Sequence, residues 1–293
     1  MPTVPTFRFA PSPNGALHLG HAYSALMNAR LAAAAEGRLL LRIEDLDRTR
    51  CKREYEQAIR DDLAWLAIAF DGAPRRQSEH ADDYARALER LSARGLAYPC
   101  FCTRGMLAGA HAGRDPDGAP LYPGTCRGLS AREVDARFAA GARPAWRLDS
   151  ARARAVASRD LSWRELGEGE TETIRLADSA AWGDFVLRGR DAAASYHLAV
   201  VVDDALQAVT DVVRGRDLFA ATSAHRLLQA ALDLPAPRYR HHRLVLDANG
   251  DKMSKSAAST PLGALRRHGA TADDVRVALG FAPGAPRFAV RLS

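Results

Sequence analysis

The first fifty residues alternate between short apolar runs and one helical run, and this order constrains the fold more than any other feature of the chain. Residues 6–10 predict a buried strand, which the prolines and glycine of residues 11–15 end in a loop. Residues 20–36 are rich in alanine with helical spacing, and Gly37 can end this helix. Residues 39–43 are again mostly apolar, as in a buried parallel strand. This order predicts a βαβ unit and an α/β fold.

The rest of the chain divides into parts by the same signals. We expect residues 1–97 and 191–256 to form one domain around the βαβ unit. Residues 98–190 hold a cysteine cluster and a loop rich in glycine, aspartate and proline, which predicts an insertion. Residues 257–293 are expected to form a short helical tail. Helices are predicted at residues 53–69, 79–94 and 218–232, a central parallel strand at 196–202 and a last strand at 244–246.

Composition bears on partners and location. The net charge of +6 suits an anionic partner such as RNA, and it equally fits a solvated arginine-rich surface. Only three of the 41 basic residues are lysines, and two of these, Lys252 and Lys255, lie close together. No apolar run approaches the roughly 20 residues that a membrane span needs. The N-terminus also lacks the pattern of a signal peptide. We therefore expect a cytoplasmic protein with no membrane partner.

The segment PSPNGALHLGH leaves the first strand and opens the first helix. A helix N-terminus attracts phosphate through unpaired N–H groups and its dipole, and Gly20 permits close approach to the backbone. His18 and His21 are three residues apart, so both imidazoles can lie on one face and donate hydrogen bonds to a phosphoryl group. On spacing alone, histidines that cap the helix or bind a metal are the simpler interpretation.

The segment KMSKS lies in a polar loop after the last predicted strand. The ammonium groups of Lys252 and Lys255 and two serine hydroxyls can surround a polyphosphate. Alone, a solvated surface loop is the simpler interpretation. Together, HLGH and KMSKS, about 230 residues apart, resemble the paired motifs of class I aminoacyl-tRNA synthetases.

That resemblance implies a Rossmann-like catalytic domain with ATP bound between the two segments. It implies catalytic roles for His18, His21 and Lys255, which would stabilise charge on the α-phosphoryl group as a carboxylate attacks it. Mg²⁺ is expected with the pyrophosphate, although no residue identifies its ligands. The ATP-binding residues implied are His18, Gly20, His21, Lys252 and Lys255.

The segments RFAPSP, RIEDLD, YHLAVVVDD and DVVRGRD resemble the glutamyl and glutaminyl branch of this class. The resemblance implies that Glu44 binds the α-ammonium of glutamate. Arg8 and Arg214 would each contact one carboxylate, because a guanidinium matches a carboxylate bidentately. A structural ion pair for Arg8 and core packing for Tyr196 are the alternatives. The glutamate-binding residues implied are Arg8, Ser12, Glu44, Tyr196 and Arg214.

Three cysteines cluster, while Cys51 stands apart. Three thiolates supply three of the four ligands of a tetrahedral structural zinc, whereas small apolar packing without a metal is the alternative. The pattern resembles the glutamyl-queuosine tRNA(Asp) synthetases, shortened relatives of glutamyl-tRNA synthetases in which a tyrosine completes the site. His111 remains a rival fourth ligand. The metal ligands expected are Cys100, Cys102, Tyr122 and Cys126.

The short segment after Ser256 favours these shortened relatives, because an ordinary glutamyl-tRNA synthetase carries a large anticodon-binding part there. The resemblance implies that the enzyme activates L-glutamate with ATP and transfers it to queuosine in the anticodon loop of tRNA(Asp). The anticodon stem-loop would then enter the active site of a monomer without an anticodon-binding domain. The alternatives are a minimal glutamyl-tRNA synthetase, a small-molecule adenylyltransferase and a silent RNA-binding protein.

Overall fold

A seven-stranded sheet organises the computed structural model, which describes residues 4–108, 113–157, 161–167, 171–246, 260–288 and 290–293. Its centre is parallel, because β1 pairs with β2 and β9, and β10 pairs with β9 and β6. The strand order is β3 (Arg75–Arg76), β2 (Arg38–Ile43), β1 (Thr6–Phe9), β9 (Asp211–Gly215), β10 (Arg238–His242), β6 (Ser162–Leu166) and β7 (Glu172–Leu176). The expected α/β class is confirmed.

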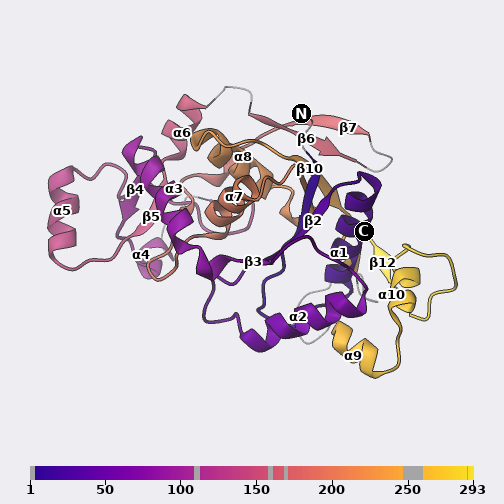
Figure 1. Cartoon of the computed structure of the whole chain (residues 1–293). Helices are drawn as coiled ribbons and strands as arrows, with labels where there is room; N and C mark the ends of the chain where they lie inside the picture. The colour runs from indigo at the N-terminus through magenta and orange to yellow at the C-terminus, as the bar shows by residue number, and fades with distance from the viewer. Residues whose placement is uncertain (1–3, 109–112, 158–160, 168–170, 247–259, 289) are drawn as a thin grey trace.

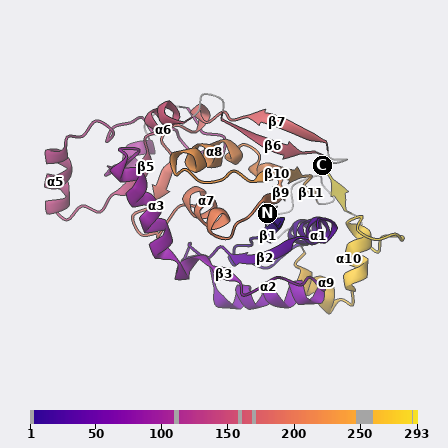
Figure 2. The same ribbon diagram turned by 45° about the horizontal axis from the view of Figure 1, so that its top comes forward.

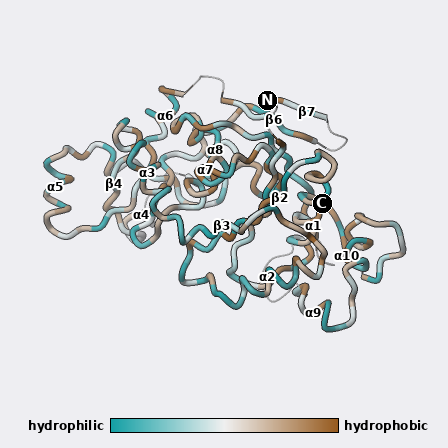
Figure 3. Tube along the Cα trace, in the orientation of Figure 1, coloured by the Kyte–Doolittle hydropathy of each residue, from teal (hydrophilic) through white to brown (hydrophobic). Residues whose placement is uncertain are grey.

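Helices cover both faces of this sheet (Figure 1, Figure 2). On one side, α1 (Leu19–Ala34) packs against β1, β2 and β9. On the other side lie α7 (Tyr196–Leu206) and α8 (Ala221–Ala231), which form an apolar core with α3 (Ala81–Ala93) and α6 (Ser150–Val156). Hydrophobic segments gather around α7 and α8 (Figure 3). The predicted βαβ start of the chain is confirmed as β1, α1 and β2.

A second sheet contains three antiparallel strands, β4 (Ala97–Cys100), β5 (Ala145–Leu148) and β8 (Val186–Arg188). Two helices, α4 (Arg104–Ala108) and α5 (Ala131–Ala139), extend from it at the edge of the molecule (Figure 1). The strands β6 and β7, which also fall inside residues 98–190, belong to the main sheet instead. The segment expected to be an insertion therefore contributes to both sheets.

The strand predicted at residues 196–202 is wrong, because this segment begins helix α7. The Ser195 side chain accepts a hydrogen bond from the Leu198 amide and caps this helix. A short apolar run has no clear period, so burial rather than periodicity decides between helix and strand. The helix continues through Asp203 and Asp204, which are both buried.

The C-terminal part confirms the expected short helices, α9 (Leu262–Arg267) and α10 (Ala272–Ala278). The predicted last strand is the short β11 (Val245–Leu246), which pairs with β12 (Arg291–Leu292) rather than with the main sheet. Helix α2 (Arg53–Trp65), the first of the separately predicted helices, packs against α9. Short 3-10 turns occur at Gln77–Glu79, Ala180–Trp182 and Arg216–Leu218.

Asp62 is buried where α2 meets α9, with the Arg266 guanidinium 3.8 Å away. Burial raises the pKa of Asp62 to about 6. Below about pH 6, the folded protein holds a proton on Asp62 that the unfolded chain releases more readily. The bound proton stabilises the fold, and this contribution is lost as the pH rises through about 6. We expect Asp62→Asn to stabilise the protein at about pH 7.5 by about 1 kcal/mol. This is less than the free energy that corresponds to a pKa shift of about two units, because solvent screening reduces the effect.

Thermal unfolding at about pH 5 and pH 7.5 checks this expectation, since the gain should shrink at the lower pH. Glu54→Gln is the matched control, because Glu54 is an exposed carboxylate on the same helix that does not contribute to the pKa shift of Asp62. A variant Asp62→Asn that is less stable than the wild type at the higher pH would show that the ion pair with Arg266 outweighs the burial cost.

Candidate active site

A cavity of about 540 Å³ opens at the carboxyl ends of β1, β2 and β9, beside the N-terminus of α1. Open α/β sheets place their ligands at this edge. Lys252 and Lys255 lie outside the described residues. The other predicted catalytic and substrate-binding residues all line the cavity: Arg8, Ser12, His18, Gly20, His21, Glu44, Tyr196 and Arg214.

The two histidines form a reciprocal cap on α1. Nδ1 of His18 accepts a hydrogen bond from the Gly20 amide at 3.1 Å, and Nδ1 of His21 accepts one from the His18 amide at 3.2 Å. Because Nδ1 acts as an acceptor in both rings, the proton of each neutral imidazole is on Nε2. The ring centroids lie only 3.9 Å apart. His18 and His21 can therefore cap the helix and line the cavity at the same time. Nδ1 of each ring accepts the capping hydrogen bond, and Nε2–H is a donor on the other side of the ring.

Gly20 is required by the position of His18. A Cβ atom at residue 20 would lie 2.9 Å from Cε1 and 3.1 Å from Nδ1 of the His18 ring. Real Cβ atoms do not approach a ring this closely, so any side chain at this position would displace the imidazole. The glycine therefore makes room for the His18 ring that caps the helix.

Arg8 and Glu44 belong to a buried network of charges. Alternation along β1 turns Phe7 and Phe9 toward the α1 core and Arg8 toward α7. There, Asp204 accepts hydrogen bonds from Nε of Arg8 at 3.1 Å and from Nη1 of Arg42 at 2.6 Å. The structural ion pair considered for Arg8 therefore exists, although the same side chain also lines the cavity.

Two carboxylates of this network have shifted pKa values in opposite directions. Burial raises the pKa of Glu44, and the charges of Arg42 and Arg8 oppose this only in part. Burial alone would also raise the pKa of Asp204, but Arg8 and Arg42 together outweigh it and leave this pKa below its ordinary value. Asp204 is thus the fixed anion of the network, and Glu44 is an anion that a bound cation would stabilise.

Sequence reasoning missed three charged members of the network, namely Arg42, Asp203 and Asp204. Arg42 is fully buried and donates to Glu44 at 3.2 Å through Nη2. Asp203 accepts from Nε of Arg75 at 2.7 Å and from Gln77 at 2.8 Å, so it links α7 to the edge strand β3. The available signal is the pair of aspartates that follows the apolar run at residues 196–202, but a strand there does not predict that they are buried. His242 was also missed; it lines the cavity, and its Nε2 has no hydrogen-bond partner among the described residues.

Arg214 is a buried cation, and its hydrogen-bond partners among the described residues are all uncharged. Its Nη2 donates to the Thr222 hydroxyl at 2.8 Å and to the Leu218 carbonyl at 3.0 Å, and its Nη1 donates to the Tyr196 hydroxyl at 3.4 Å. Burial and the charge of Arg214 keep the pKa of His225, 3.2 Å from Nη1, well below its ordinary value. A buried guanidinium among neutral groups favours an anionic ligand.

A second groove of about 940 Å³ continues from the cavity toward the cysteine cluster. It shares Ser12, Asn14, Glu44 and Tyr196 with the cavity. Three arginines, Arg48, Arg50 and Arg190, line the groove farther out.

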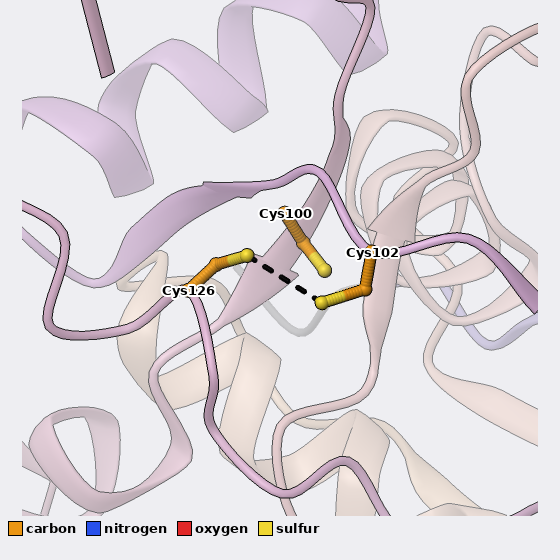
Figure 4. A group of neighbouring side chains, drawn as sticks. All are labelled: Cys100, Cys102 and Cys126. Atoms are coloured by element: carbon orange, nitrogen blue, oxygen red, sulfur yellow. Dashed lines mark hydrogen bonds between the residues drawn. The ribbon is translucent and has the colours of Figure 1, made fainter. Parts of the chain in front are cut away.

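The predicted cysteine cluster is assembled in the structure (Figure 4). The sulfur atoms of Cys100, Cys102 and Cys126 lie within 4.8 Å of one another, and Sγ of Cys102 is 3.6 Å from Sγ of Cys126. Thiolates around a tetrahedral zinc are separated by about 3.8 Å, since each Zn–S bond is about 2.3 Å. These three side chains could therefore hold a metal ion.

Tyr122 lies beside the same cluster. Its hydroxyl lies 3.5 Å from Sγ of Cys102 and accepts a hydrogen bond from the Cys126 amide at 2.8 Å. The Arg147 guanidinium lies over the Tyr122 ring, 4.0 Å from its centroid. The rival ligand His111 lies outside the described residues.

Comparison with known proteins agrees with this geometry. Residues 4–275 match the family described as tRNA synthetases class I (E and Q), catalytic domain. The chain belongs to this family. It is an enzyme of the aminoacyl-tRNA synthetase type, with the α/β catalytic domain that the sequence predicted.

Individual relatives refine the comparison. A glutamyl-Q tRNA(Asp) synthetase of Rhodobacter capsulatus is 42% identical over 290 residues, which cover 94% of this chain and 99% of the relative. Glutamate–tRNA ligase 2 of Nitrosococcus oceani is 39% identical over 89% of this chain, but only 56% of that relative is covered. The crystal structure of a glutamate–tRNA synthetase from Elizabethkingia anophelis matches with a TM-score of 0.77 and 26% identity, over 94% of this chain and 61% of that one.

The sequence also predicts that the chain contains no membrane span. Among the described residues, none of the helices has the length and apolar character needed to cross a bilayer.

Proposed function

We propose that the protein activates L-glutamate with ATP and transfers the glutamyl group to the queuosine base in the anticodon loop of tRNA(Asp). The observation that carries the proposal is one cavity in which a histidine-capped helix N-terminus faces the buried Arg214 and the network of Arg8 and Glu44. The glutamyl-Q tRNA(Asp) synthetase relatives, covered almost end to end in one case, support the acceptor.

Glutamate fits the charges of the cavity. Its α-ammonium would pair with Glu44, while Arg8 and Arg214 would each contact one carboxylate. The Tyr196 hydroxyl, which already contacts Nη1 of Arg214, would bind the side-chain carboxylate with it, and Ser12 would contact the α-carboxylate end. An amide in place of the side-chain carboxylate would leave the charge of Arg214 uncompensated.

The first chemical step would be in-line displacement at phosphorus. An oxygen of the glutamate α-carboxylate attacks the α-phosphorus of ATP, and the bond to pyrophosphate breaks as glutamyl-adenylate forms. The Nε2–H groups of His18 and His21 donate to the phosphoryl oxygens, together with Lys252 and Lys255. Mg²⁺ would neutralise the pyrophosphate.

In the second step, a hydroxyl of the cyclopentene ring of queuosine would attack the glutamyl carbonyl carbon and form an ester. AMP would leave with the electron pair of the mixed anhydride, and its phosphate would accept the hydroxyl proton. The anticodon loop would approach along the second groove, where Arg48, Arg50 and Arg190 can contact its phosphates. The three cysteines and Tyr122 would hold a structural zinc beside this groove, which Cys102 also lines. A monomer in the cytoplasm is the proposed form.

The deciding experiment supplies purified protein with ATP, Mg²⁺, labelled glutamate and tRNA(Asp) with or without queuosine. We expect label only on the queuosine-bearing tRNA, retained in the anticodon fragment after the 3′ end is removed. Label on the 3′ end of tRNA(Glu) would identify a minimal glutamyl-tRNA synthetase instead. Adenylate formation without labelled RNA would favour a small-molecule adenylyltransferase, and no pyrophosphate exchange would favour a silent RNA-binding protein.

Glutamate affinity should fall with decreasing pH. Glu44 binds an ammonium only as a carboxylate, and burial raises its pKa, so it becomes protonated at a higher pH than an ordinary glutamate. Calorimetric titration of glutamate from about pH 8 to pH 5 should show this loss. Glu44→Gln should bind about a hundredfold more weakly and lack this component of the pH dependence. An unchanged pH profile in Glu44→Gln would exclude Glu44 as the titrating group.

A further inference from the structure

We infer that Glu165 and His241 are positioning residues for Arg214, which orient its guanidinium for an acidic substrate without competing for the substrate's carboxylate. This inference rests on the proposed role of Arg214 in glutamate binding. The three side chains come from the adjacent strands β6, β10 and β9. His241 lies opposite Arg214 in the parallel register, and Glu165 lies opposite Tyr239, two residues before His241.

The hydrogen bonds between these residues have a single consistent direction. Glu165 accepts from Nδ1 of His241 at 2.9 Å and from the His241 amide at 2.9 Å. Nε2 of His241 accepts from Nε of Arg214 at 3.1 Å. Because a carboxylate only accepts and a guanidinium only donates, His241 must be neutral with its proton on Nδ1.

The electrostatics agree with this assignment. Burial, aided by the charge of Arg214, lowers the pKa of His241 despite its bond to Glu165. Burial alone would raise the pKa of Glu165, but hydrogen bonds from His241 and from the Trp163 indole, at 2.9 Å, leave it below its ordinary value. The relay therefore consists of an ionised carboxylate, a neutral imidazole and a guanidinium.

The neutral imidazole of His241, which lies between Glu165 and Arg214, explains how this relay would favour an acidic substrate. A carboxylate in direct contact with Arg214 would compete with the substrate for the same donors. Glu165 instead orients the Nε edge through His241, while Thr222 and Leu218 hold Nη2. Nη1 lies 3.2 Å from Nδ1 of His225 and donates to the Tyr196 hydroxyl at 3.4 Å. The Tyr196 contact is the longest hydrogen bond of Arg214, so a substrate carboxylate can displace it most easily.

Two variants test the relay by pyrophosphate exchange, run with tRNA present and with glutamate or glutamine as substrate. We expect Glu165→Gln to raise the KM for glutamate about tenfold and to reduce the preference for glutamate over glutamine. The kcat and the KM for ATP should stay unchanged. His241→Phe should raise this KM about a hundredfold, and the double variant should be no worse, since Glu165 acts through His241. Glu172→Gln, an exposed carboxylate of the next strand, should behave as wild type.

His241→Gln keeps an acceptor for Nε of Arg214 and should recover most of the affinity lost in His241→Phe. This pair remains decisive if Glu165→Gln folds poorly. Suppose that the wild-type enzyme prefers glutamate, and that Glu165→Gln and His241→Phe leave both the KM for glutamate and the preference over glutamine unchanged. This result would overturn the role of Glu165 and His241 but not the proposed function. A wild-type enzyme without any preference for glutamate would overturn the proposed function instead.

Discussion

His18→Asn should form glutamyl-adenylate about a hundredfold more slowly or worse, while its stability stays close to that of the wild type. Asparagine is a favoured N-cap, so its side-chain oxygen can replace Nδ1 of His18 as the acceptor of the Gly20 amide. It cannot replace the Nε2–H group on the far side of the ring. Loss of one donor to a developing oxyanion typically costs a factor of about 10² to 10³.

Single-turnover adenylate formation and thermal unfolding separate the two roles. His18→Ala should lose the cap as well, with a destabilisation of about 1 kcal/mol. Ser130→Ala is the matched control, because it removes a similar reciprocal cap from α5. It should cost stability without changing activity. If His18→Asn formed the adenylate at the wild-type rate, His18 would be a cap and nothing more.

Removing the proposed structural zinc should have the second large effect. Binding of a structural zinc contributes on the order of 10 kcal/mol in small zinc domains, and the cysteine cluster joins the end of β4 to a long loop. We expect Cys126→Ser, or treatment with a chelator, to abolish zinc binding and hydrogen-exchange protection in β4, β5 and β8. The strands β1, β2 and β9 should keep their protection, because the apolar core that they form with α1 shares no residue with the cysteine cluster.

Transfer to RNA should suffer more than adenylate formation in this variant. Arg190 lines the groove and donates to the carbonyls of Phe101 at 2.8 Å and Cys102 at 2.9 Å, so loss of the metal would release this side chain. Metal analysis with Cys51→Ser as the control should show zinc retained, since Cys51 is outside the cluster. Tyr122→Phe should weaken zinc binding and His111→Ala should not; the opposite result would make His111 the fourth ligand.

Much of the fold and site could be predicted where neighbours in sequence are neighbours in space. The strand, loop and helix around His18 and His21 are contiguous, so the motif and its position beside the cavity come together. The cysteine spacing likewise identified a cluster that the structure assembles. In contrast, residues 196–202 were assigned to a strand, because a short apolar run fits a buried strand or a buried helix equally well.

The sequence by itself determined which chemical groups are present and which short segments carry them: a capped helix start, arginines in apolar strands and three thiols. Only the tertiary structure decided how those groups pair. Asp204 reaches Arg8 and Arg42 only because α7 is a helix, and Glu165 reaches Arg214 only because β6 joins the main sheet beside β10. A buried charge requires a partner, but its identity depends on which distant strands become neighbours, and local sequence patterns do not encode that choice.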